Sequence, residues 1–498
     1  MPKTENLYIV NFGEHEPILY ALRELEKKNT IKIKKILDYD EYFSILKNFF
    51  NINIISFYSH IRLRNLDSLN TLNYLNDDLI AFTDIYIDSA IDILQTRHSK
   101  NCKDFSYQES KLLFYSSLNR SINELRSASI DVVFFNHIPH HFNTYVLYIA
   151  AKFLKIKTLI LTKLSFNGFR YYFQDSINYR SWSIVKGLQF TQNADINDLK
   201  EYEYLRDRAL YSSPNYMSIK YNKSVSNFLA FYFQKFNIFF VLVSLYGALK
   251  YGFFKRIPNH FKWDREGSFS EEQFPFKFQQ SMHQIQSIFK IDKLSKVYKK
   301  HCKFPDIKKK YVLFAPNYQP EATTLPVAGR YSDVILCVKL LRSALSDDVH
   351  IYYKEHADVF NLTLESFRAR SEGFYNELSK IDKLSICPME ASQIQLIDNS
   401  LFVAIQTSNI GLESIIRGKN ILTFGPLWYE KLGRVYKWDL IKEKKRIDIF
   451  LKNPSYINFK LLNELNKYTF RLDNIMNNDD HSDLLRLREF LCLNLKSL

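Results

Sequence analysis

The sequence has few of the features that identify several common classes of protein. Only five Cys occur among its 498 residues, scattered and never in a C-x-x-C pair, which argues against a disulfide framework or a zinc finger. Glycine is also scarce, at 12 residues, and Gly13 after the first apolar run stands alone rather than in a G-x-G-x-x-G fingerprint. A dinucleotide cofactor is therefore not indicated.

The sequence also lacks a secretory signal and a long hydrophobic run. Residues 1–11 do not show a charged segment followed by an apolar one, so we expect a cytoplasmic protein. The densest apolar run, residues 238–249, is shorter than the about 20 residues that span a bilayer. It is either a buried core helix or an interfacial segment, because the basic and aromatic residues 250–256 suit an anionic membrane surface.

Length and charge set further limits. A chain of 498 residues is too long for one hydrophobic core, so we expect at least two domains. The formal net charge of +15 favours an anionic partner such as a nucleic acid, an acidic lipid or a phosphorylated substrate. Because no basic tail and no zinc-finger or RNA-recognition signature is present, no nucleic-acid partner is expected.

Short apolar runs alternate with helical patterns in two parts of the chain. This rhythm predicts an α/β fold in which crossover helices connect parallel strands. It breaks down in residues 165–305, which are rich in aromatic and charged residues and contain a polar, linker-like stretch at 264–273. We expect an N-terminal domain at 1–305 that includes a helical insertion at 165–305, a second domain at 306–430, and C-terminal helices at 431–498 that pack back on the first domain. The predicted strands include residues 7–10, 131–135, 158–161, 311–315, 349–353, 401–405 and 421–424.

Polar clusters follow three predicted strands of the second domain. Ligands of such sheets bind beyond the carboxyl ends of the strands, so these clusters predict a ligand site. Residues 407–413, Thr-Ser-Asn-Ile-Gly-Leu-Glu, occupy a strand-to-helix turn whose amide groups favour a phosphate; ordinary helix capping is the alternative. Lys354 and His356 can reach the same phosphate, although a charged strand end is often only solvated.

The third cluster is Gln319-Pro320-Glu321. Its proline fixes the backbone and directs Glu321 away from the strand. A carboxylate beside the anomeric carbon of a sugar can act as base, nucleophile or stabiliser of an oxocarbenium-like state. Asp333 is a second carboxylate nearby, which more plausibly caps its own helix.

In the first domain, a strand at residues 131–135 ends in Asn-His-Ile-Pro-His-His, residues 136–141. Three readings of these histidines are open. They pack as loop residues beside Pro139, they contact a substrate or carry protons, or they bind a metal. Metal binding is the least favoured of the three, because no further ligand lies at a zinc-like spacing.

The motifs at residues 318–326, 354–356 and 407–413, with Gly418-Lys419 and Phe424-Gly425, resemble the capsule and surface-polysaccharide biosynthesis glycosyltransferases. These enzymes have the GT-B fold and include the retaining β-Kdo transferases. Residues 135–141, with their helix and residues 156–159, also look like the N-terminal domain of that family. The resemblance covers about half the chain and implies two Rossmann-like domains that face each other across a cleft.

The resemblance also implies roles for individual residues. Glu321 would stand at the anomeric centre, and His140 and His141 would face the acceptor. Members of the family often carry Glu where this chain has His141, which leaves the identity of the acid or base open. The residues implied in binding the donor nucleotide are Gln319, Lys354, His356, Thr407, Ser408, Asn409, Gly411 and Glu413.

The expected activity is transfer of a sugar, such as Kdo or a related ulosonic acid from a CMP-sugar, onto a capsule, O-antigen or lipopolysaccharide acceptor. Its partners would be a nucleotide sugar and a glycan or glycolipid at the inner membrane. No cofactor is expected, and no metal, because no Asp-x-Asp motif stands at a convincing strand end. The alternatives are a sugar-nucleotide epimerase on the same scaffold and a non-catalytic protein of polysaccharide assembly or export.

Overall fold

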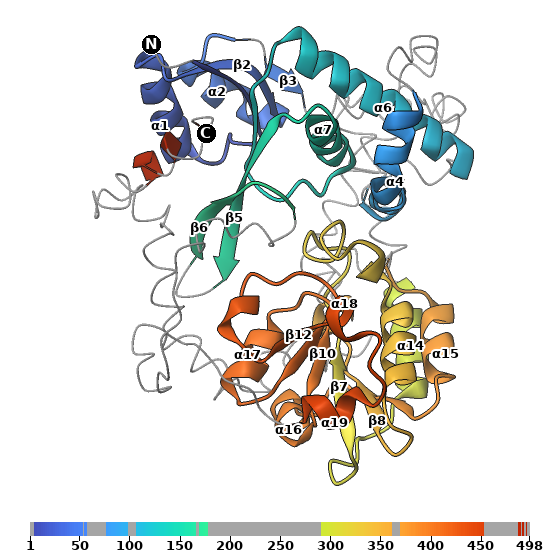
Figure 1. Ribbon diagram of the computed structural model, residues 1–498. Helices are drawn as coiled ribbons and strands as arrows, with labels where there is room; N and C mark the ends of the chain where they lie inside the picture. The colour runs from blue at the N-terminus through green and yellow to red at the C-terminus, as the bar shows by residue number, and fades with distance from the viewer. Residues whose placement is uncertain are drawn as a thin grey trace, which may run out of the picture.

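The computed structural model shows two lobes (Figure 1). We call the described residues up to 177 the first lobe and residues 290–452 the second lobe. The predictions for residues 238–249, 250–256 and 264–273 fall outside the described part of the chain. Among the described residues, no helix is both long and apolar enough to cross a membrane. The structure describes residues 4–52, 54–56, 76–97, 106–165, 169–177, 290–360, 369–452, 487–489, 491, 492 and 495.

The first lobe is built on a six-stranded sheet with the order β3-β2-β1-β4-β5-β6. The strands are parallel except for β6, which pairs antiparallel with β5. The strands are β1 (Glu5–Val10), β2 (Ile31–Asp38), β3 (Ile54–Ser56), β4 (Val132–Phe135), β5 (Lys157–Ser165) and β6 (Phe169–Gln174). The helices are α1 (Glu16–Lys27), η1 (Asp40–Tyr42), α2 (Phe43–Phe49), α4 (Asp77–Arg97), α6 (Tyr107–Ser127) and α7 (Phe142–Phe153).

The second lobe contains another six-stranded sheet, in the order β12-β11-β10-β7-β8-β9, with every neighbouring pair parallel. The strands are β7 (Tyr311–Ala315), β8 (His350–Tyr353), β9 (Leu384–Ile386), β10 (Val403–Ile405), β11 (Ile421–Thr423) and β12 (Val435–Lys437). The helical elements are η7 (Gly329–Ser332), α14 (Val334–Ala344), η8 (Ala357–Phe360), α15 (Glu372–Ser379), α16 (Gln393–Asn399), α17 (Ile410–Ile416), η10 (Glu430–Leu432), α18 (Trp438–Ile441) and α19 (Ile447–Leu451).

The two sheets share one topology. Numbered within its own sheet, each has the strand order 3-2-1-4-5-6 of the Rossmann fold. The order reverses between β1 and β4 in the first lobe and between β7 and β10 in the second. These reversal points are where ligands bind in such sheets. The prediction of an α/β fold with two Rossmann-like sheets is thus confirmed.

Two features differ from the sequence-based expectation. β6 lies inside the segment predicted as a helical insertion, and it extends the first sheet antiparallel to β5. β12 follows residue 430, where only helices were predicted, and pairs with β11. Ile447 and Leu451 of α19 pack into the core of the second lobe. The second lobe therefore extends beyond the predicted limit of residue 430.

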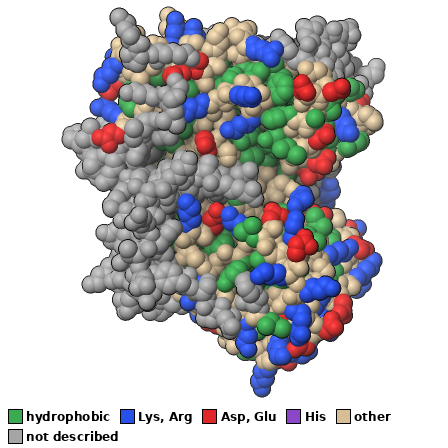
Figure 2. All heavy atoms as spheres, viewed as in Figure 1, with side chains coloured by type: hydrophobic (Ala, Val, Ile, Leu, Met, Phe, Trp, Pro, Cys, Tyr) green, Lys and Arg blue, Asp and Glu red, His purple; other side chains and the backbone are tan. Residues whose placement is uncertain are grey.

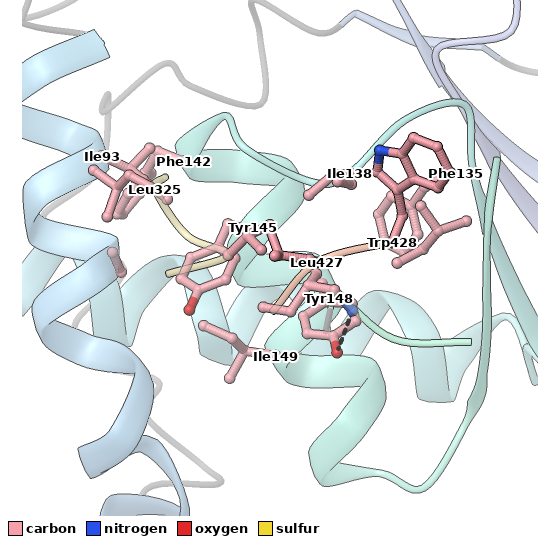
Figure 3. Packing of buried hydrophobic residues seen from close by; sticks show 14 of the residues in the cluster. Ile93, Phe135, Ile138, Phe142, Tyr145, Tyr148, Ile149, Leu325, Leu427 and Trp428 are labelled. Atoms are coloured by element: carbon pink, nitrogen blue, oxygen red, sulfur yellow. Dashed lines mark hydrogen bonds between the residues drawn. The ribbon is translucent and has the colours of Figure 1, made fainter. Parts of the chain in front are cut away.

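A continuous hydrophobic cluster joins the lobes. Figure 3 shows Leu325, from the loop after β7, beside Ile93 of α4 and Phe142 of α7. Trp428, from the loop after β11, lies beside Phe135 at the end of β4. Loops at the carboxyl ends of β7 and β11 thus contact the end of β4 and the start of α7, so the reversal points of the two sheets lie toward each other.

The C-terminal segment returns to the first lobe. Leu487, Leu491 and Leu495 are fully buried in a cluster that contains residues of α1, β1 and α2. Arg488 forms an ion pair with Glu24 of α1 at 2.9 Å between Nη2 and Oε2. Figure 1 accordingly places the C-terminus beside α1.

Candidate functional site

Three neighbouring strands of the second sheet end in the three predicted clusters. β7 lies between β10 and β8, so the ends of all three strands are adjacent. The Glu321 loop follows β7, His356 follows β8, and Ser408 follows β10. The sheet topology thus brings together clusters that lie far apart in the sequence.

The turn after β7 holds Glu321 at the surface. The Gln319–Pro320 peptide bond is cis. Thr323 donates a hydrogen bond from Oγ1 to Glu321 Oε2 at 2.8 Å, while the Glu321 carbonyl accepts from the amide of Leu325 at 2.8 Å. The backbone of the turn is therefore fixed, and the Glu321 carboxylate remains exposed.

The Gln319 side chain forms hydrogen bonds within the lobe that stabilise this turn. Its Nε2 donates to the carbonyl of Ser332 at 2.6 Å, and its Oε1 accepts a hydrogen bond from Arg370. Arg370 is buried and forms an ion pair with Glu355 at 3.0 Å. A chain of polar contacts thus runs from the end of β8 to the turn that carries Glu321.

Lys354 and Glu355 are part of the scaffold of the β8 end. Lys354 Nζ donates to the carbonyls of Pro388 and Met389 at 2.8 and 2.6 Å, and burial lowers its pKa to about 8. Glu355 accepts hydrogen bonds from the hydroxyls of Tyr353 and Tyr375 at 2.8 and 2.9 Å. The structure places these two side chains inside the lobe.

His356 follows the carboxyl end of β8, and its side chain is half-buried. Its Nδ1 accepts a hydrogen bond from the amide of Asp358 at 3.2 Å, so the neutral ring carries its proton on Nε2. Its ring centroid lies 5.9 Å from that of Tyr318, a residue of the loop after β7. His356 therefore presents an N–H donor beside the Glu321 loop.

The β10 end uses most of its polar groups within the chain. Thr407 donates from its amide to Asn317 Oδ1 at 3.0 Å and from Oγ1 to the carbonyl of Thr323 at 2.7 Å. Ser408 accepts the Ile410 amide on Oγ at 3.4 Å and the Gly411 amide on its carbonyl at 3.2 Å. The first amides of the seven-residue helix α17 are thus already paired.

Two other predicted residues of this turn differ in exposure, because Asn409 is exposed and Glu413 is buried. Asn409 stands at the N-cap position of α17 without a capping side-chain bond, and its Oδ1 accepts from Trp428 Nε1 at 3.3 Å. Glu413 is buried on the same helix. Asn409 consequently links this turn to the loop that contacts the first lobe.

Gly411 is required by packing. A Cβ built at this position would lie 2.5 Å from Ile405 Cδ1 and closer still to the Tyr429 hydroxyl, which bonds the carbonyl of Ser408. We expect Gly411→Ala to lower the free energy of unfolding by about 1–3 kcal/mol through overpacking. The control is Gly373→Ala, whose Cβ would have only Ser371 Oγ nearby, at 3.7 Å, and should change stability by less than about 1 kcal/mol. Urea denaturation compares them, and equal stabilities would contradict the packing role.

Buried polar atoms remain unpaired at both reversal points. Asn11 follows β1 and is buried, and neither its Oδ1 nor its Nδ2 has a hydrogen-bond partner among the described residues. Gln406 follows β10 and donates from Nε2 to the carbonyl of Tyr331 at 2.6 Å, but its Oε1 is likewise unpaired within the described chain. Burying such atoms without partners costs about 1–3 kcal/mol each, which a ligand or water at these points would offset.

In the first lobe, the histidines after β4 form one group. The ring centroids of His140 and His141 are 4.3 Å apart, and those of His137 and His140 are 4.7 Å apart. His141 is the N-cap residue of α7. Ile138, between them in sequence, belongs to the cluster that joins the lobes, and Figure 3 shows it on the side of Trp428.

Sequence reasoning missed Asn11, Asn317, Arg370 and Trp428. The first two follow apolar strands, and a lone polar residue at such a position is a weak signal that could have found them. Arg370 lies in no motif, and its role is visible only through its burial beside Glu355. Trp428 is a large aromatic residue in a loop, which the sequence alone does not distinguish from ordinary core.

Residues 329–451 match the family described as "Capsule polysaccharide biosynthesis protein". This segment runs from η7 to the end of α19 and includes His356, Ser408 and α17, while Glu321 lies just before it. The resemblance to the capsule polysaccharide biosynthesis proteins is thereby confirmed over residues 329–451, which form most of the second lobe. No curated protein matches the chain.

Two solved structures are similar to the chain at low sequence identity. The chain is 18% identical to the beta Kdo 2,7 transferase of KpsC from Thermosulfurimonas dismutans, over 30% of this chain and 45% of that one, with a TM-score of 0.19. It is 10% identical to UDP-GlcNAc 2-epimerase from Methanocaldococcus jannaschii, over 93% of this chain and 99% of that one, with a TM-score of 0.24. The match thus spans less than half the length of the KpsC chain. At these scores neither likeness decides the activity.

Proposed function

We propose that this chain is a glycosyltransferase of surface-polysaccharide synthesis that uses a nucleotide-activated sugar. The observation that carries the proposal is the adjacency of the β10, β7 and β8 ends, with His356 beside Tyr318 of the loop that carries Glu321 and the first lobe opposite. The family match over residues 329–451 supports the polysaccharide assignment. The donor we propose is a CMP-linked ulosonic acid such as Kdo, as the resemblance to the β-Kdo transferases implies.

In this proposal the nucleotide phosphate lies against His356 and the Ser408 turn. The Nε2–H of His356 donates to a phosphate oxygen, and Ser408 Oγ contacts the same group. The bond between the anomeric carbon and the phosphate oxygen breaks, and CMP departs as an anion. No metal is required at this phosphate, because protein hydrogen-bond donors balance its charge.

Glu321 would act at the anomeric carbon. Its exposed carboxylate stabilises the positive charge that develops on the sugar as CMP leaves. The acceptor hydroxyl approaches from the first lobe, where His140 or His141 takes its proton. The acceptor oxygen then bonds to the anomeric carbon. The products are the extended glycan and CMP.

The surface charge fits the proposed partners. Figure 2 shows many Lys and Arg side chains on the second lobe, with acidic side chains interspersed. Together with the net charge of +15, this favours an anionic donor and an acidic acceptor or lipid surface. We propose peripheral contact with the inner membrane on this basis.

The decisive test is a panel of donors. The purified chain is incubated with CMP-Kdo, other CMP-sugars and UDP-sugars, each with and without a synthetic Kdo-terminated glycolipid acceptor, and products are identified by mass spectrometry. Transfer that needs the acceptor supports the proposal. Conversion of the donor to an isomer without acceptor would establish the epimerase alternative. Nucleotide binding without any product would favour a non-catalytic assembly protein.

We expect His356→Ala to weaken CMP binding about 10- to 100-fold, because a hydrogen bond to a charged group contributes about 1.5–3 kcal/mol. Isothermal titration calorimetry measures the change. The matched control is His350→Ala, since His350 begins the same strand at its opposite end. If both variants bound CMP as the wild type does, His356 would not contact the phosphate.

A further inference from the structure

His137, His140 and His141 form a cluster at the end of β4 that the sequence spacing did not reveal. One ring nitrogen from each lies within 4.8 Å of the others, and all three side chains are half-buried. Ligand spacing along the chain gave no strong reason to expect a metal, because no further ligand lies at a zinc-like spacing. The turn around Pro139 brings the first histidine back beside the other two.

One carbonyl group orients two of these rings. The Nδ1 atoms of His137 and His140 lie 3.0 and 2.7 Å from the carbonyl oxygen of Ile138. A carbonyl only accepts hydrogen bonds, so each Nδ1 carries a proton. In the neutral ring the lone pair is then on Nε2. Metal-binding histidines are commonly held in this way, with the other ring nitrogen donating to a backbone carbonyl.

The backbone around the cluster is held in place. The carbonyl of His141 accepts hydrogen bonds from the Tyr145 amide at 2.8 Å and from Thr144 Oγ1 at 3.0 Å. Ile138 is buried in the cluster between the lobes. The histidines therefore project from a fixed turn.

We propose that His137, His140 and His141 bind a divalent transition-metal ion of the zinc class. Zinc–nitrogen bonds of about 2.0–2.1 Å in a tetrahedral site place ligand atoms about 3.3 Å apart. The ring nitrogens lie within 4.8 Å of one another in this structure, so metal binding requires the rings to turn toward a common centre. Three imidazoles leave the fourth position for water or for an oxygen of a ligand, as in zinc sites with an open position.

Metal binding at this site is tested separately from the proposed transferase activity, because it is measured without any sugar. The two assignments also differ for His140 and His141. An imidazole that coordinates a metal through Nε2 does not accept a proton there. A metal would thus replace the proton-accepting role of these two side chains.

The test titrates the full-length protein, first treated with a chelator, with ZnCl2 in the presence of a chromophoric competitor. The wild type is expected to bind Zn²⁺ tightly. Each of His137→Ala, His140→Ala and His141→Ala should weaken binding more than about 100-fold, because even changes beyond the ligands cost about 10- to 100-fold. The control is His301→Ala, an exposed histidine that contacts Asn376 at 2.8 Å, and its affinity should not change.

Absence of wild-type binding, or affinities in all three variants equal to that of the wild type, overturns the proposal. The visible absorption spectrum of bound Co²⁺ provides a second measurement, which shows the type of side chain that binds the metal. Visible bands of a four-coordinate Co²⁺ site without thiolate charge transfer are expected, whereas a thiolate band would assign the ion to cysteines instead. Folding is checked by circular dichroism. His141 makes no side-chain cap bond to α7, so His141→Ala retains the helix and decides the outcome if another variant unfolds.

Discussion

Replacing Arg370 with Met is expected to lower the free energy of unfolding by about 3–5 kcal/mol, because it leaves a buried carboxylate without its cation. The side chains of Arg370 and Glu355 are only 1% and 0% exposed, and Nε lies 3.0 Å from Oε2. The two tyrosine hydroxyls that also donate to Glu355 carry no charge to compensate it. Chemical denaturation measures the loss.

The control is Lys310→Met, which breaks a shorter ion pair on the surface. Lys310 lies 2.7 Å from Asp348, but both side chains are more than half exposed, so about 0–1 kcal/mol is expected. The double variant Arg370→Met/Glu355→Met should recover part of the stability, because it removes both charges together. Equal effects of Arg370→Met and Lys310→Met would show that the buried pair does not support the lobe.

The second large effect is expected for Glu321→Gln. Sugar transfer should fall about 10³-fold or more, since an amide supplies neither the charge nor the basicity of the carboxylate. Stability and CMP affinity should remain near wild type, because within the described part of the chain the exposed carboxylate accepts a hydrogen bond from Thr323 Oγ1 alone. Single-turnover assays give the rate and calorimetry the affinity.

Asp333→Asn provides the comparison for Glu321→Gln. Asp333 is the other carboxylate considered from the sequence, and it accepts the Leu336 amide at 3.0 Å as the N-cap of α14. Its replacement should retain transfer. If Glu321→Gln transferred sugar at the wild-type rate, Glu321 would have no role at the reacting centre. If that variant unfolded, the role of Glu321 would be structural.

The sequence predicts buried parallel strands well where each is a compact apolar run, as at β1, β4 and β7. Helix α7 was likewise predicted from its apolar face. β12 was missed because only three residues pair and basic residues surround it. β6 was missed because its polar and aromatic residues do not form an apolar run. Both segments become strands because they pair with a neighbouring strand, and a local sequence pattern does not show such pairing.

The candidate site was predictable in its location but not in its contacts. Polar clusters at strand ends indicated where the ligand would bind, and the strand order makes those ends adjacent. A sequence does not show which way a side chain turns. Lys354 was therefore assigned to a phosphate, although its amine reaches two backbone carbonyls. The partnership of Gln319 with Arg370 likewise depends on the tertiary fold. The roles of the predicted residues stay predictions.

The return of residues 487–495 to the first lobe affects how the chain folds as it is synthesised. Domains generally fold in order of emergence from the ribosome, the N-terminal one first. Here the first lobe lacks Leu487, Leu491 and Leu495 of its core until the whole second lobe has been synthesised. The second lobe, whose sheet is contiguous in sequence, can mature earlier. Until then the surface that these leucines cover is open to chaperones and to aggregation.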